Sequence, residues 1–166
     1  MDSLDLDGWH DFAAATAGVA GALAGLIIVA VSVNVKQIIE GSALPARAGA
    51  TIASIAVILV SAMAMLIPTQ PALWLGLEIV GFTVVALLFQ ADAAVRILRS
   101  HDSGLTLGRK IGTIVLGVGQ FSGLLIGGAL IMSGDASGVF HVAAGFIAIF
   151  IVAIVNAWVL MVEILR

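Results

Sequence analysis

The sequence lacks cysteine and has little charge, and each absence excludes whole classes of protein. None of the 166 residues is cysteine, which excludes disulfides, thiolate metal sites and cysteine nucleophiles. Charged residues make up 10% of the chain and hydrophobic residues 61%, which leaves too little polar surface to coat a soluble globule. The basic residues form no run or stripe, so we expect no nucleic-acid partner.

The common catalytic motifs are also missing. The glycines stand in apolar segments, whereas a phosphate-binding loop places them between a strand and a helix. No serine occurs in a G-x-S-x-G pattern, and no H-E-x-x-H is present. Retinal chemistry needs a lysine within a helix, and Lys36 and Lys110 both lie outside the apolar segments. We therefore predict that the protein is not an enzyme and needs no cofactor.

The chain has instead a series of long apolar segments, which we place at residues 12–35, 48–67, 72–91, 111–132 and 139–160. Each is close to the ~20 residues that cross about 30 Å of hydrocarbon at 1.5 Å per residue. Only a helix satisfies its backbone hydrogen bonds within one such segment. The prediction is an all-α integral membrane bundle of five transmembrane helices that forms a single domain over residues 1–166.

The basic residues predict how these helices are threaded. With five crossings all of them fall on one side: Lys36, Arg47, Arg96, Arg99, Arg109, Lys110 and Arg166. Because Lys and Arg stay on the cytoplasmic side, we expect the N-terminus outside and the C-terminus in the cytoplasm. The first residues are acidic rather than basic, so residues 12–35 are interpreted as a permanent helix and not as a signal peptide. The predicted location is the inner (plasma) membrane of a cell.

Small residues recur every four positions in the first and fourth apolar segments. The two rows are Ala17, Gly21 and Gly25, and Gly119, Gly123 and Gly127. Such rows let helix backbones approach closely, which drives association where lipid supplies no hydrophobic push. Packing within one small bundle explains a single row better than a subunit interface does. Two rows in one short chain favour some self-association.

Two carboxylates fall in the third apolar segment, where charge is costly. Glu78 lies about two turns from the outer end and has no basic residue nearby in the sequence. We expect it to be protonated, hydrated or bonded to a neighbouring helix. Asp92, at the inner end, precedes Arg96 by four residues. That spacing favours an ion pair at the membrane boundary over a part in an ion pathway.

Other polar side chains extend a candidate ion pathway from Glu78 toward the cytoplasmic side: Gln120, Asn156, Asn34 and Ser32. An equally strong interpretation is that Gln120 and Asn156 only form hydrogen bonds between helices. A candidate outer vestibule consists of Asp7, Asp11, Asp135, His10 and His141. These come from separate segments without metal-ligand spacing, so we predict no metal site there.

The first third of the chain contains W-H-D-F at residues 9–12, an Ala/Gly-rich helix that ends in V-A-V-S-V-N at 29–34, and L-P-A-R at 44–47. In these motifs it resembles a family of small multi-pass membrane proteins of actinobacteria. Members of that family are sometimes labelled modulators of a membrane-bound AAA protease, and the resemblance supplies no catalytic residues. A fainter likeness joins L-A-G at 23–25 and V-A at 29–30 to the pore helix of Orai calcium channels. The acidic filter position of those channels is missing, and the predicted direction of the helix is opposite.

These features favour two functions of different classes. The first is a homo-oligomeric channel or transporter for a small cation or proton, with Glu78 as the intramembrane site. The second is a non-catalytic accessory or regulatory subunit of a larger membrane complex, for example a membrane protease or a respiratory assembly, that packs through its glycine faces. We favour the first because an isolated intramembrane acid usually marks a pathway.

Overall fold

The computed structural model of the chain describes residues 6–40, 44–99 and 107–164, with the side chains of these residues except 7, 37 and 159–164. Within these ranges a 3-10 turn, η1 (Asp7–Trp9), is followed by α-helices. They are α1 (His10–Val33), α2 (Val35–Glu40), α3 (Leu44–Ala64), α4 (Ala72–Arg99), α5 (Leu107–Gly119), α6 (Ser122–Met132) and α7 (Gly138–Ile164).

The predicted class of protein is confirmed. α1, α3, α4, the α5–α6 pair and α7 form five spans that are long and apolar enough to cross a membrane. Large apolar side chains remain exposed on the outside of these spans, among them Leu26, Val33 and Leu88. In water such a surface would aggregate. The chain is therefore an all-α, multi-pass membrane protein whose outer surface contacts lipid.

The helix bounds differ from the predicted ones mainly at the charged end of the bundle. α4 continues to Arg99 rather than ending at 91, and α5 begins at Leu107 rather than at 111. The length of an apolar run indicates where a span leaves the hydrocarbon. The helix itself can continue into the polar region, because polar side chains there still stabilise helical backbone. In α4 the ion pair between Asp92 and Arg96, with Oδ2 and Nε 2.8 Å apart, lies within the added turns.

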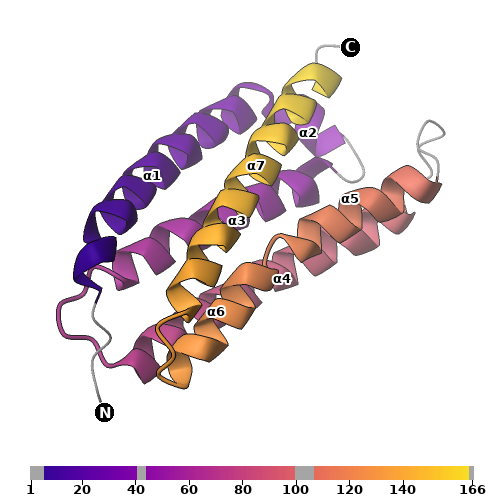
Figure 1. The fold of residues 1–166 in the computed structure, drawn as a ribbon. Coiled ribbons are helices and arrows are strands. Elements are labelled where there is room, and N and C mark those ends of the chain that lie inside the picture. The colour runs from indigo at the N-terminus through magenta and orange to yellow at the C-terminus, as the bar shows by residue number, and fades with distance from the viewer. Residues whose placement is uncertain (1–5, 41–43, 100–106, 165–166) are drawn as a thin grey trace.

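The spans pack as an antiparallel bundle (Figure 1). α3 lies against α1, α4 and α7, and α6 lies between α4 and α7. Two of these contacts depend on glycine. A Cβ at Gly76 of α4 would lie 2.6 Å from the carbonyl oxygen of Gly128 on α6, and a Cβ at Gly127 would lie 2.6 Å from that of Gly138 on α7. The backbones therefore approach more closely than any larger residue allows.

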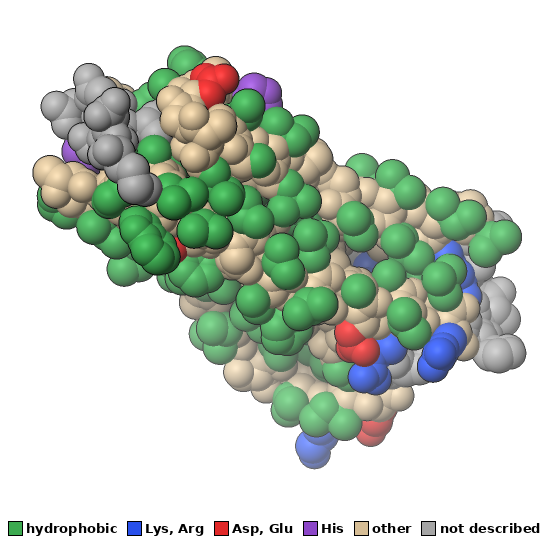
Figure 2. All heavy atoms as spheres, turned by 90° about the horizontal axis from the view of Figure 1, so that it is seen from below, with side chains coloured by type: hydrophobic (Ala, Val, Ile, Leu, Met, Phe, Trp, Pro, Cys, Tyr) green, Lys and Arg blue, Asp and Glu red, His purple; other side chains and the backbone are tan. Residues whose placement is uncertain are grey.

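The described basic residues gather at one end of the bundle, together with the acidic Glu40 and Asp92. The described basic residues lie where α2 and the last turns of α4 meet the first turns of α3 and α5, an end that we call the basic end (Figure 2). Asp11, Asp135, His10 and His141 lie at the opposite end. Arg166 falls outside the described residues. That the basic end faces the cytoplasm stays a prediction.

Candidate functional site

The fourth span is interrupted at Gln120 and Phe121, between α5 and α6. The Phe121 N–H donates to the Val118 oxygen at 3.2 Å instead of to that of Gly117, its regular helical acceptor. The Gly117 carbonyl oxygen accepts hydrogen bonds from two side-chain amides in place of the Phe121 N–H. Gln120 Nε2 donates to the Gly117 oxygen at 2.7 Å, and Nε2 of Gln90, on α4, donates to the same oxygen at 2.9 Å. Side chains of this kind make a break tolerable at membrane depth.

The local sequence explains why the helix breaks here. Gly117 and Gly119 each weaken a helix by about 1 kcal/mol relative to alanine. Gly117 also leaves the space that Gln90 occupies, since a Cβ there would lie 2.7 Å from Gln90 Nε2. Gln120 and Gln90 are 6% and 9% exposed. The buried Oε1 of Gln120 has no hydrogen-bond partner among the described residues, so the break retains one unused acceptor.

A cavity of about 460 Å³ extends from the break toward the basic end. It forms because α5 follows α4 and diverges from α7, whereas α6 packs against both (Figure 1). Its volume falls within the range of about 300–1,000 Å³ that is typical of small-molecule sites. The lining comes from α3, α4, α5 and α7, and no residue of α6 contributes to it.

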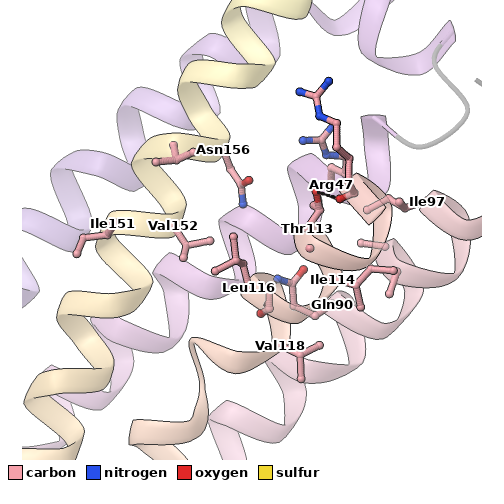
Figure 3. A pocket seen from close by; sticks show the side chains of 16 residues that line it. Arg47, Gln90, Ile97, Thr113, Ile114, Leu116, Val118, Ile151, Val152 and Asn156 are labelled. Carbon is pink, nitrogen blue, oxygen red and sulfur yellow. Dashed lines mark hydrogen bonds between the residues drawn. The ribbon is translucent and has the colours of Figure 1, made fainter. Parts of the chain in front are cut away.

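The cavity lining is mostly apolar, with a small number of polar groups and two cations. The polar lining residues are Gln90, Thr113 and Asn156, and the cations are Arg47 and Arg109. Figure 3 shows Gln90 and Asn156 directed into the space from α4 and α7. The Thr113 hydroxyl donates to the Arg109 carbonyl oxygen at 3.0 Å. Within the described part of the chain, the Asn156 side chain has no hydrogen-bond partner. Among the lining residues that the structure describes, none is acidic.

Beyond the break α6 packs closely against α7 and α4, and we call this half of the bundle the closed side. On α6, a Cβ at Gly123 would lie 2.6 Å from the His141 carbonyl oxygen of α7, and Gly127 is similarly close to Gly138. Leu124 and Ile131 are fully buried between these contacts. The cavity therefore approaches the break from the basic end, while glycine-mediated packing fills the other half.

Of the predicted pathway residues, the structure brings Gln120 near Gln90 and places Asn156 in the cavity lining. Glu78 lies elsewhere. Its Oε2 accepts a hydrogen bond from Gln70 Nε2 at 2.8 Å, and it precedes Gln90 by twelve residues of α4. That separation is about 18 Å along the helix. Glu78 is thus on the closed side of the break.

The other pathway residues do not line the cavity. Ser32 Oγ donates to the Ile28 oxygen at 2.7 Å, and Asn34 Nδ2 donates to the Ala30 oxygen at 2.9 Å. Both therefore bond back to α1 itself. Asp92 is exposed and paired with Arg96, as their spacing predicts.

The predicted vestibule residues lie around the starts of α1 and α7. Trp9 packs edge-on against Phe140 with ring centroids 4.9 Å apart, which holds these two helix starts together. Asp135 accepts the Ser137 N–H at 2.8 Å, and hydrogen bonds from Ser137 hold the pKa of its carboxyl below the ordinary value, with a smaller contribution from His141. Asp11 and His10 lie on the first turn of α1, and the side chain of Asp7 is outside the described set. Among the described residues, no three His, Asp or Glu could hold a metal ion.

The two glycine rows have different surroundings. Gly123 and Gly127 contact α7 within the same chain, whereas a Cβ added at Gly119, Gly21 or Gly25 would have no neighbouring atom within 4 Å. Ala17 is half-buried. The second row therefore serves mainly the fold of one protomer, and the first row leaves an open face on α1.

Sequence reasoning missed Gln90, and it treated Arg47 and Arg109 only as markers of topology. One signal for Gln90 was present: it is an amide within an apolar stretch, as Gln120 is. The pairing of the two amides depends on how α4 and α5 align, which a single sequence does not reveal.

Comparisons of the chain with protein-family models, curated proteins and solved structures found no match. The resemblance of its first third to actinobacterial membrane proteins stays a prediction.

Proposed function

We propose that the protein is a carrier that moves a proton or a small cation across the membrane. The observation that carries this proposal is the broken fourth span, with a cavity that approaches the break from one end. Interrupted helices supply free backbone groups and buried amides at mid-membrane, and secondary transporters commonly bind their cargo at such breaks. The unpartnered Oε1 of Gln120 is an acceptor of this kind.

The packing favours a carrier over an open pore. Alternating access requires that a central site open to one side while the other side is closed. Here the basic end contains the cavity, and the opposite half is filled by the contacts of Gly76, Gly123 and Gly127. A continuous pore would need polar or open lining in both halves.

Glu78 favours a proton or a cation as the cargo. It is half-buried on the closed side, and its hydrogen-bond partner is the neutral amide of Gln70. An amide has both donors and an acceptor, so it can bond to the charged and to the protonated carboxyl. The Oε1 of Gln70 is buried and has no hydrogen-bond partner among the described residues. If the amide turned over, this oxygen would face Glu78 and could accept a hydrogen bond from the O–H of a protonated carboxyl.

The first test is the effect of Glu78→Gln on transport. In proteoliposomes with a pH-sensitive dye, we expect the wild-type chain to raise proton or cation flux above that of empty liposomes. Glu78→Gln is expected to lower that flux at least about tenfold, because an amide cannot exchange a proton or balance a cation. Asp92→Asn is the matched control, since Asp92 is an exposed carboxylate of the same helix, and its flux should stay within about twofold.

Two results would contradict the carrier. One is a wild-type flux equal to that of empty liposomes across protons and the alkali cations. The other is a flux that survives Glu78→Gln unchanged.

Self-association is the second part of the proposal, and α1 is the element that supports it. The residues that α1 buries within the protomer are Ala13, Thr16, Ala20 and Ile27. At about 100° per residue, Gly18, Gly21 and Gly25 lie on the other side of this helix, where they are exposed with open space around them. A second helix can approach closely on such a face.

We expect Gly21→Leu to weaken self-association without unfolding the protomer. The leucine meets no atom of its own chain but blocks close approach of a second α1. Native mass spectrometry in mild detergent measures the ratio of oligomer to protomer. Gly81→Leu is the control, because Gly81 is also exposed with open space but lies on α4. If Gly21→Leu and Gly81→Leu lowered the ratio of oligomer to protomer equally, α1 would not be the subunit contact.

The open face of α1 also supports the second function class, an accessory subunit of a larger membrane complex. A face of small residues accepts a helix of another protein by the same close packing. Membrane-protease modulation is the partner class implied by the resemblance of the first third of the chain. Crosslinking from Gly21→Cys in native membranes distinguishes the two: capture of the same chain alone would contradict the accessory role.

A further inference from the structure

We propose that the cavity between α3, α4, α5 and α7 binds an anionic phospholipid, with its phosphate at Arg47 and Arg109 and part of an acyl chain along the apolar walls. The proposal extends beyond carrier function and does not depend on it, because a lipid site can serve any membrane protein. It rests on the charge, the position and the shape of the cavity.

The charged residues that line the described part of the cavity are both positive. Arg47 comes from α3 and Arg109 from α5, and none of the described lining residues is acidic. Asp92 lies on the same part of α4, but it is exposed and paired with Arg96. Arg47 takes part in another interaction, yet a guanidinium has five N–H donors in a planar fork and can bind further acceptors. That fork matches the geometry of a phosphate.

Both arginines lie at the ends of apolar spans, where we expect the phosphates of the bilayer. Arg47 is in the first turn of α3 (Leu44–Ala64), and Arg109 is in the first turn of α5 (Leu107–Gly119). These turns are at the basic end, at the boundary of the apolar spans. The positive dipole end of each helix adds to the attraction for an anion. Basic pockets between spans at such a boundary are typical sites for anionic headgroups.

The shape of the cavity favours a lipid over a free anion. Its walls include Ile97, Leu116, Ile151, Val152 and Val155. Three of these, Leu116, Ile151 and Val155, are more than half exposed, at 64%, 59% and 54%. They border the gap between α5 and α7 and belong to the lipid-facing surface of the spans. A lipid can therefore enter sideways from the bilayer, with its chain against these side chains.

Asn156 and Thr113 lie between the cations and the apolar walls. Figure 3 shows Asn156 directed from α7 toward the part of the cavity that contains Thr113. The Asn156 amide has no hydrogen-bond partner within the described part of the chain and can donate to an ester oxygen. A polar group at this level fits the glycerol region, which separates the phosphate of a lipid from its chains.

A bound lipid phosphate would also change the electrostatics of the cavity. Arg47 and Arg109 without an anion raise the potential at the mouth and disfavour a cation there. A phosphate between them offsets that charge, so the proposed carrier would operate best in membranes that contain anionic lipid.

The test is native mass spectrometry of the full chain in mild detergent, with added phosphatidylglycerol or phosphatidylcholine of the same chains. We expect phosphatidylglycerol to bind at least about tenfold more tightly, since charge-assisted bonds to two arginines discriminate the headgroups. Inorganic phosphate at millimolar concentration should not displace it, because the apolar contacts are absent from that ion. Displacement by inorganic phosphate would identify a free-anion site instead and overturn the lipid proposal.

Three variants locate the site. The double variant Arg47→Gln/Arg109→Gln should lose the preference for phosphatidylglycerol. Lys36→Gln/Arg99→Gln, which removes the same charge from the basic end outside the cavity lining, should retain it. Val152→Trp should lower phosphatidylglycerol binding at least about tenfold with every charge intact, because the indole fills the apolar part of the cavity.

The proposal is overturned if both lipids bind equally to the wild-type chain, or if the two charge variants behave alike. If Arg47→Gln/Arg109→Gln fails to fold, as judged by its thermal unfolding in detergent, Val152→Trp decides. Unchanged lipid binding in a folded Val152→Trp protein would exclude the cavity.

Discussion

Gly127→Ala is expected to lower the free energy of unfolding by about 3 kcal/mol, at the upper end of the usual cost of overpacking. The added Cβ would lie 2.6 Å from the carbonyl oxygen of Gly138 and 2.8 Å from the backbone nitrogen of Val142. Both obstacles are backbone atoms of α7, which cannot rotate away as a side chain can. α6 and α7 must therefore separate along their length, and the dispersion energy of this interface is lost.

Gly25→Ala is the matched control for this prediction. Gly25 has no atom near the position of the added Cβ, so the substitution should stabilise the helix by up to about 1 kcal/mol. Unfolding by SDS in mixed micelles, followed by tryptophan fluorescence, measures both variants. If Gly127→Ala and Gly25→Ala changed stability in the same direction, the close contact of α6 and α7 would be wrong.

Phe121→Ala is expected to destabilise the protein by about 2 kcal/mol and to change the cavity at the basic end. Phe121 is fully buried and stands at the break, directly before α6. Phe→Ala in a water-soluble core costs about 3–5 kcal/mol. Because lipid is as apolar as the core, the transfer part of that cost is absent here and the packing part remains. Loss of the ring removes packing at the junction of α5 and α6, so we expect the angle between these two helices to change.

Phe89→Ala separates the loss of packing from the loss of an aromatic group. Phe89 is 51% exposed, and its removal should change the SDS unfolding midpoint little. Labelling of an Asn156→Cys variant by a water-soluble thiol reagent reports on the cavity. We expect its rate to change at least about twofold in Phe121→Ala and to be unaffected by Phe89→Ala. A labelling rate that Phe121→Ala leaves unchanged would mean that the break does not maintain the cavity.

The break shows where sequence reasoning succeeds and where it ends. Residues 111–132 have the length and apolarity of one span, and in that sense the prediction of a fourth crossing is confirmed. A hydropathy average depends only on the side chains of a segment and contains no information about its backbone hydrogen bonds. The break depends on the Gly117 carbonyl, which accepts from Gln90 of another helix, and this partner is defined only when α4 and α5 align.

The sequence by itself determined the class of this protein, its number of spans and the clustering of its basic residues, because these depend on local sums of hydropathy and charge along the chain. Its glycine spacing could not distinguish Gly127, which packs against α7, from Gly25, which has open space. That difference depends on which helix lies opposite each face. The tertiary structure alone also decided that Arg47 and Arg109 share one cavity, because α5 leaves α7 at the break and creates the space between them.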